Sequence, residues 1–404
     1  MAPSATDVLP EASKASNNDL TLSKQTSHYV DLWSKHVAVE SAQDHIITDV
    51  DGKKYIDFIS QFSVVNFGYS HPKIAKAAAD QIYKMPLVGT SYISPLYAKF
   101  AERITTKFGF DYIATMLSGS EAVESAVKIA RKWAYTKKGI SEGEAWILTT
   151  DQCYHGLTLA TMPLATVVAK NFGQHVPNVG PYAPTSGKLI HYGDVEVLEE
   201  TLKQDGHKIA AFLVEAVQAP ASHQKGYLKA VQDLCNKYNI LFICDEIQSG
   251  YGRTGKDLAY QHEEGVKPDL VTLGKAVTGG FYPMSVIMGK KHVMDVLGKN
   301  EVLSTFGASP VACAAAIASL EVLEEENISE RSQRLGELLT KTVKKLSPPH
   351  VKELRGGALF QSLVLDDPPI TITEEDLVKA IEIVVQALKD VTALGDFPGS
   401  DFIN

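Results

Sequence analysis

The sequence predicts an α/β protein with a mostly parallel, doubly wound sheet and a smaller α+β domain built from both chain ends. Three observations favour this fold class. Short apolar segments alternate with stretches of helical periodicity from about residue 60 to residue 320, as in strand–helix–strand units. An Asp51-Gly52 turn between two strand-like runs predicts a hairpin over residues 46–58. A chain of 404 residues with 45% apolar content can bury a core large enough for two domains.

The strands of the large domain are expected where short β-branched or apolar segments are bounded by turn residues. These segments are residues 113–117, 145–149, 209–215, 240–245 and 270–273. Helical periodicity predicts helices over residues 121–137 and 228–238 between them. After Pro310 an alanine-rich helix leads into another over residues 329–346, which returns the chain to the small domain. We expect a flexible arm (1–27), the two parts of the small domain (28–60 and 321–404) and a large domain (61–320).

Composition excludes several classes of partner. The net charge of −9 argues against binding to a nucleic-acid backbone, and no apolar stretch approaches the roughly 20 residues that cross a bilayer. The first 27 residues contain no arginine, which disfavours a mitochondrial transit peptide. The four cysteines show neither metal-ligand nor disulfide-framework spacing. We therefore expect a cytoplasmic protein that binds no metal.

Lys275 and Asp245 each follow or end an expected parallel strand. Because an α/β sheet gathers its functional groups at the carboxyl ends of its strands, the two side chains are expected to face one crevice. An amine that condenses with an aldehyde and a carboxylate that keeps a pyridine nitrogen protonated are the groups that pyridoxal phosphate requires. The alternative is that they are ordinary strand-end residues, solvated or capping a helix.

The sequence around these residues carries a longer pattern. Residues 245–255 read D-E-I-Q-S-G-Y-G-R-T-G and residues 272–280 read T-L-G-K-A-V-T-G-G. Together they resemble the signature of the class III, fold-type I pyridoxal-phosphate aminotransferases. The resemblance spans about residues 50–365 and is nearest to the ornithine δ-aminotransferases, with further matching passages at residues 63–73, 130–139 and 321–327. It implies a homodimer that transfers an amino group from an amine donor to a keto acceptor.

The resemblance also implies roles for residues around the cofactor ring. Lys275 is expected to bind the cofactor aldehyde and then to move a proton between substrate and cofactor. Asp245 is expected at the pyridine nitrogen and Gln248 at the phenolic oxygen. Tyr154 and His155 follow the strand at residues 145–149, and the Tyr154 ring matches the position that stacks on the pyridine face. The alternative for Tyr154 is a core aromatic.

Two segments are expected to hold the cofactor phosphate. Residues 118–121, S-G-S-E, join a strand to a helix, where unpaired amides and the helix dipole stabilise an anion. The resemblance assigns the contacts to Gly119 and Ser120; the alternative is a plain N-cap with a glutamate in the first turn. Ser304 and Thr305 resemble the segment that reaches the phosphate of the neighbouring subunit, so each active site would need two chains.

The substrate side departs from the family pattern. Leu157 stands where ornithine aminotransferases carry an arginine that fixes a substrate carboxylate, and Pro220 stands at an acidic gate position. Glu215 resembles a family glutamate near the active site, or is a strand-end acid paired with an arginine. Tyr29 matches a residue near the entrance. After residue 365 the chain is shortened and lacks a second carboxylate-binding arginine.

Losing a buried Arg–carboxylate contact costs about 2–5 kcal/mol, enough to change the substrate class. We therefore expect the donor to be a terminal or otherwise unconventional amine. Two alternatives stay open. The same residues support racemisation, epimerisation or another carbanion reaction, and the shortened end would also fit a truncated, catalytically impaired homologue or a binding protein without activity.

Overall fold

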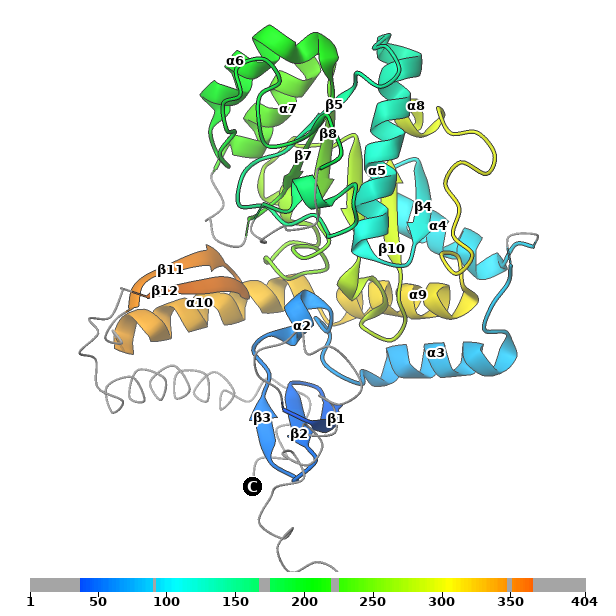
Figure 1. Ribbon diagram of the computed structural model, residues 1–404. Helices are drawn as coiled ribbons and strands as arrows, with labels where there is room; N and C mark the ends of the chain where they lie inside the picture. The colour runs from blue at the N-terminus through cyan, green and yellow to red at the C-terminus, as the bar shows by residue number, and fades with distance from the viewer. Residues whose placement is uncertain (1–36, 90–91, 167–174, 219–224, 347–350, 366–404) are drawn as a thin grey trace, which may run out of the picture.

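The computed structural model describes residues 37–89, 92–166, 175–218, 225–346 and 351–365, and it confirms the α/β fold (Figure 1). Within these ranges the strands form a seven-stranded sheet, a three-stranded sheet and a two-stranded hairpin. Tyr29, Pro220, the arm at residues 1–27 and the chain end at residues 366–404 lie outside the described residues.

The seven-stranded sheet is mixed but mainly parallel. In spatial order its strands are β4 (Tyr112–Met116), β10 (Ser285–Gly289), β9 (Leu270–Leu273), β8 (Leu241–Asp245), β7 (Ile209–Glu215), β5 (Trp146–Leu148) and β6 (Val179–Gly180). β10 runs antiparallel to both its neighbours, and the sequence did not predict it. In the parallel part, Glu215 pairs with Asp245 and Asp245 pairs with Thr272. The carboxyl ends of β7, β8 and β9 therefore meet at one edge.

Helices cover both faces of this sheet. The helices of the described residues are α2 (Ser60–Ser63), α3 (Pro72–Lys84), α4 (Pro95–Phe108), α5 (Gly119–Trp133), α6 (Val195–Asp205), α7 (Tyr227–Lys237), α8 (Lys291–Met294), α9 (Pro310–Glu325) and α10 (Ile328–Leu346). Short helical turns are the π-helix η2 (Ala134–Lys138) and the 3₁₀ turns η3 (Met162–Leu164), η4 (Gly206–Lys208), η5 (Ala259–His262) and η6 (Lys275–Thr278).

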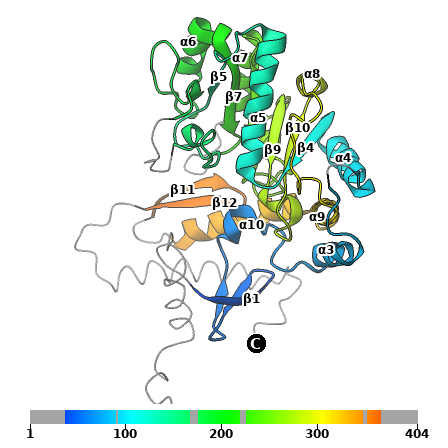
Figure 2. The same ribbon diagram turned by 45° about the vertical axis from the view of Figure 1, so that its right-hand side comes forward.

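Alternate residues of β7 show the two-sided burial directly. Phe212 and Val214 belong to a core shared with α3, α4, α7 and α9. Ala211 and Leu213 belong to a second core shared with α5 and α8. Figure 2 shows α5 and the α3, α4 and α9 group on opposite sides of β9, β10 and β4. Because each fully buried Phe, Val or Leu contributes about 1.5–3 kcal/mol, these two cores hold the strand ends rigidly in place.

The start of α5 explains how a strand becomes a helix beside this edge. The sequence predicts a helix over residues 121–137, whereas α5 begins earlier, at Gly119, and its last predicted turn is π-helical. Ser118 and Glu121 form a capping box, in which each side chain accepts the other residue's backbone N–H. This box fixes the position at which the chain leaves β4 and enters α5.

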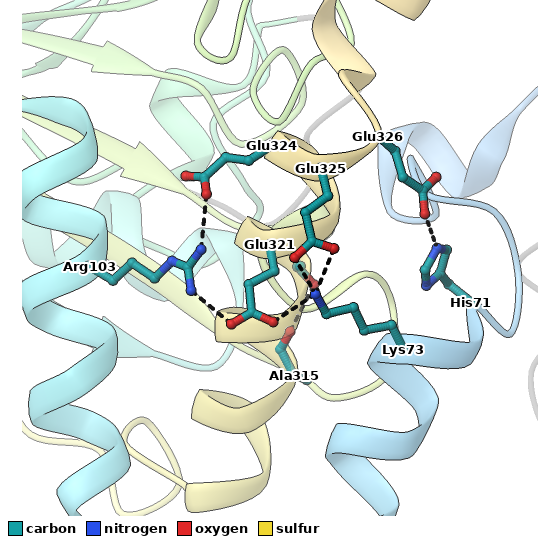
Figure 3. A network of polar contacts seen from close by, with 9 residues as sticks. His71, Lys73, Arg103, Ala315, Glu321, Glu324, Glu325 and Glu326 are labelled. Carbon is teal, nitrogen blue, oxygen red and sulfur yellow. Dashed lines mark hydrogen bonds and ion pairs between the residues drawn. The ribbon is translucent and has the colours of Figure 1, made fainter.

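A network of ion pairs holds α3 and α4 against the end of α9 (Figure 3). The acidic members at the helix end are Glu321, Glu324, Glu325 and Glu326. Negative charge is unfavourable at a helix C-terminus, so these carboxylates need cations. Arg103 of α4 donates to Glu321 at 2.8 Å and to Glu324 at 2.9 Å, and Lys73 of α3 contacts Glu321 at 2.9 Å. Since α9 also contacts η6, the network supports the turn that carries Lys275.

Near each end of the described part of the chain, a small sheet lies outside the large one (Figure 1). The predicted hairpin is confirmed as β2 (Ile46–Asp49) and β3 (Lys54–Ile56), and β1 (Val39–Gln43) adds a strand that was not predicted. Near the other end, β11 (Val351–Gly357) pairs with β12 (Phe360–Leu365). Across the described ranges, no helix combines the length and apolar character needed to cross a membrane.

Candidate active site

Asp245 lies at the centre of the strand-end edge. It is the last residue of β8 and only 5% exposed. Its Oδ1 accepts hydrogen bonds from the Thr272 hydroxyl and from the Ile247 amide, both at 3.0 Å. Its Oδ2 lies 2.6 Å from His155 Nδ1. These partners hold the carboxylate in one orientation.

Lys275 begins η6, is separated from β9 by Gly274 alone, and shares this region with two acids. Its φ of 46° lies in the left-handed region, a strain of about 1–3 kcal/mol that is typical of functional positions. Burial lowers the pKa of Lys275, while the carboxylates of Asp245 and Glu215 oppose that effect. The amine is thus closer to its neutral, nucleophilic form than an exposed lysine would be.

Glu215 ends β7 opposite Asp245 and is a weak acid. Burial raises its pKa to about 8, against the opposing effect of His155 and with a further increase from Asp245. At neutral pH the carboxyl group is therefore mainly protonated. Within the described ranges Glu215 forms no ion pair with an arginine, so the alternative of an Arg-paired acid finds no support.

The segment after β5 brings an exposed ring next to a buried one. Tyr154 is 46% exposed, so it is not the core aromatic of the alternative interpretation. His155 is 2% exposed and contacts Asp245. Gly156 has a φ of 106°, and a Cβ there would overlap the Ser120 side chain. This close approach packs the segment against the start of α5.

The amino-terminal end of α5 satisfies both interpretations of its sequence. Ser118 Oγ accepts from the Glu121 amide at 3.2 Å, and Glu121 accepts from the Ser118 amide at 2.7 Å, so the predicted N-cap is present. The amides of Gly119 and Ser120 occupy the first helical positions, which have no intrahelical acceptor. A Cβ at Gly119 would lie 3.1 Å from Ile247, so the helix start lies against the segment after Asp245. The cap and an anion site are therefore compatible.

Taken together, these groups fit pyridoxal phosphate. A buried, oriented carboxylate suits a protonated ring nitrogen, an amine of lowered pKa suits the aldehyde, and the free helix amides suit the phosphate. Gln248 lies in the turn after β8 and is half-buried. Leu157, 47% exposed, directly follows the Tyr154 segment and brings no charge.

The structure of one chain does not bring Ser304 and Thr305 into this group. They line a cavity of about 360 Å³ whose wall also includes Tyr92, which is 78% exposed. Among the described residues lining that cavity, neither Lys275 nor Asp245 occurs.

Sequence reasoning missed three polar side chains behind the site: Thr149, Cys153 and Thr272. Thr272 had a detectable signal, because a hydroxyl inside an otherwise apolar buried strand needs a partner. Thr149 gave the same signal at the end of its strand. Cys153 gave none, because a buried thiol reads as a small apolar residue.

Comparison with known proteins agrees with this geometry. Residues 29–388 match the family described as aminotransferase class-III. An ornithine aminotransferase of Emericella nidulans is 38% identical over 396 residues, which cover 89% of this chain and 87% of that protein. A crystal structure of ornithine aminotransferase from Toxoplasma gondii, with partial occupancy of PLP at its active site, is 30% identical with a TM-score of 0.82, covering 94% and 96% of the two chains. An (S)-enantioselective omega-transaminase from Thermomicrobium roseum is 26% identical with a TM-score of 0.78, covering 94% and 99%.

The chain belongs to the class-III aminotransferase family, whose members depend on pyridoxal phosphate. Within that family it is an ornithine aminotransferase-like enzyme. These similarities favour transamination over racemisation and over an inactive homologue.

Proposed function

We propose that this aminotransferase accepts a terminal primary amine whose binding does not depend on an anchored carboxylate. Leu157 carries the proposal. It is 47% exposed beside Tyr154, and it offers an apolar surface where the family pattern has a guanidinium. Glu215, mainly protonated near neutral pH, adds no negative charge to this region, which suits an apolar substrate flank. The donor chemistry that suits this wall is an amine on an apolar or carboxylate-free carbon chain.

We propose the following roles for residues that hold the cofactor. When bound, pyridoxal phosphate supplies an aldehyde that carries the amino group and a ring that withdraws electrons. Asp245 holds the ring nitrogen protonated. Gly119 and Ser120 bind the phosphate through their amides, and Tyr154 covers one ring face. The supports are the buried, hydrogen-bonded carboxylate and the free amides at the start of α5.

Three further residues complete the proposed site. Gln248 binds the phenolic oxygen of the cofactor, and His155 supports Asp245 from behind. Lys275 binds the aldehyde at rest and, once the substrate amine has displaced it, moves a proton at the substrate carbon. Its lowered pKa supports this second role, because a neutral amine can accept that proton.

A matched pair of donors tests the substrate class. Ornithine and 1,4-diaminobutane differ only by the carboxylate, so the ratio of their kcat/KM values isolates the missing anchor. We expect the wild-type enzyme to favour 1,4-diaminobutane. Leu157→Arg should shift the ratio toward ornithine by about tenfold or more. Leu159→Arg, at a position that is 71% exposed two residues away, is the control and should not. A wild-type preference for ornithine that Leu157→Arg leaves unchanged would overturn the proposal.

We also propose a homodimer in which Ser304 and Thr305 reach the phosphate of the partner's site. The support is the cavity that they line, which exposes Tyr92 and Ile93 on the surface of a single chain. Mixing Lys275→Ala chains with Thr305→Ala chains tests it, because a mixed dimer rebuilds one intact site. Random pairing should restore about a quarter of wild-type activity. Exchange of chains in the mixture is verified first. If exchange occurs and activity does not recover, the shared site is contradicted.

Two further expectations remain proposals. The supported location is a reducing compartment such as the cytosol, because all four cysteines are buried and free. The proposed domain division places residues 61–320 in the large domain, and its support is that all seven strands of the large sheet fall inside that range.

A further inference from the structure

A chain of buried hydrogen bonds runs from Asp245 away from the proposed cofactor site. Asp245 Oδ2 lies 2.6 Å from His155 Nδ1, and His155 Nε2 lies 3.3 Å from Thr149 Oγ1. The Thr149 hydroxyl lies 3.6 Å from Cys153 Sγ, and Cys153 Sγ lies 3.0 Å from the carbonyl oxygen of Leu164. All five residues are buried.

The far end of this chain fixes the direction of its donors. A carbonyl oxygen only accepts, so the Cys153 thiol proton points at Leu164. The sulfur then accepts from the Thr149 hydroxyl, which is the donor in that contact. With its one proton engaged, Thr149 Oγ1 is left to accept from His155 Nε2–H. At the near end, an ionised Asp245 also only accepts, so His155 Nδ1 carries a proton as well.

We propose that Thr149 and Cys153 are positioning residues that keep His155 doubly protonated behind Asp245. A charged imidazole donates to Asp245 Oδ2 and holds that oxygen in place. Asp245 Oδ1 already accepts from Thr272 and from the Ile247 amide, so the second lone pair of Oδ2 remains for the ring nitrogen of the cofactor. This inference deepens the proposed function, because it rests on the role of Asp245 toward that nitrogen.

The charges around His155 agree with this assignment. Burial lowers the pKa of His155, but the hydrogen bond to Asp245 and the charge of that carboxylate, with a further increase from Cys153, outweigh burial and raise it well above its ordinary value. Glu215 faces the same ring from β7, and its pKa of about 8 leaves it mainly uncharged at neutral pH. Lys275 faces Asp245 and Glu215 from η6. Asp245 is thus the carboxylate that balances the imidazolium.

The sign of the pH dependence follows from the raised pKa. His155 keeps its second proton as the pH rises past the value at which an ordinary histidine loses it, about 6.5. The stabilisation is complete below that value and is lost only when the pH passes the higher pKa of the folded state. The proposal therefore predicts a charged His155 ring at neutral pH, and a neutral His155 ring there would contradict it.

Nitrogen-15 NMR of the histidine side chains tests the inference in the full-length chain, with pyridoxal phosphate bound and again after its removal. The His155 signals are assigned by their loss in His155→Gln. We expect the wild-type ring to show both N–H groups at pH 7.5 in each state. A ring with an unprotonated Nε2 in the wild-type protein overturns the proposal, and this measurement needs no variant that must fold.

Two substitutions at Cys153 distinguish a role in this chain of hydrogen bonds, called the relay below, from a role in packing alone. In Cys153→Ser the new hydroxyl still donates to Leu164 and accepts from Thr149, so both ring N–H signals should persist. In Cys153→Ala the Thr149 hydroxyl is released to donate to Nε2, so the Nε2–H signal should be lost at pH 7.5. Cys235→Ala, which truncates another fully buried cysteine, is the control and should leave the ring unchanged. Identical ring signals in Cys153→Ala and Cys153→Ser would also overturn the relay.

The NMR signals of His155 and the binding of pyridoxal phosphate can fail independently of each other. A doubly protonated ring in a chain that fails to bind pyridoxal phosphate would refute the cofactor role and leave the relay standing. A cofactor-loaded, active enzyme with a neutral His155 would do the reverse.

Discussion

The protonation state of Glu215 makes a prediction whose size follows from the structure. Burial at the end of β7, next to Asp245, raises its pKa from 4.5 to about 8. The folded protein therefore binds a proton that the unfolded chain has lost between these two values. Stability from this residue is complete below a pH of about 4.5, falls as the pH rises, and stops falling above a pH of about 8.

The magnitude comes from the width of that interval. At about 1.36 kcal/mol per pH unit, the full interval corresponds to at most about 5 kcal/mol. Because Glu215 is only half-buried, solvent screening reduces this to about 3 kcal/mol. Glu215→Gln keeps the shape of the neutral acid and removes the titration. Its stability should therefore match wild type near pH 5 and exceed it by about 3 kcal/mol near pH 8.5.

The assay is urea unfolding of wild type and Glu215→Gln across pH 4.5 to 9, followed by intrinsic fluorescence. Glu264→Gln is the matched control, because Glu264 is exposed and the same change is made there on the surface. Parallel stability curves for wild type and Glu215→Gln would refute the reasoning, since they would mean that Glu215 ionises alike in the folded and unfolded states.

Further predictions concern the framework around the site. Arg103→Ala removes the cation that bridges Glu321 and Glu324 at the end of α9, and we expect a loss of about 1–2 kcal/mol in urea unfolding that shrinks at high salt. Lys76→Ala breaks an exposed pair on α3 and should cost at most about 0.5 kcal/mol; equal losses in these two variants would argue against the network. Gly336→Ala places a Cβ where the Ala358 carbonyl lies, so it should destabilise the α10–β11 region by about 2 kcal/mol, and an unchanged unfolding midpoint would show that this contact is looser than described.

The strands that line the site were the easiest elements to predict. Residues 209–215 and 270–273 have their predicted bounds, because a fully buried parallel strand is a continuous apolar run closed by turn residues. β10 escaped prediction for a physical reason. Its run, Ser285–Gly289, is short, and its place between β4 and β9 depends on pairings with residues far away in the sequence.

The site residues also divide into those that the sequence places and those that only the folded chain brings together. Lys275 and Asp245 could be placed together because the ends of parallel strands share an edge. The contact of His155 with Asp245 joins residues 90 positions apart, and no local pattern encodes it. The sequence gives no signal for Cys153, because its contacts are with one carbonyl and one hydroxyl that only the folded chain brings near.

The pairing of Lys275 with a cofactor held by Asp245 is tested most directly by the visible absorbance of the purified chain during titration with pyridoxal phosphate. Wild type should develop the band of lysine-bound cofactor, and Lys275→Ala should bind the cofactor without that band. Lys267→Ala, at an exposed lysine before the amino end of β9, should behave as wild type. Retention of the band in Lys275→Ala would contradict the account.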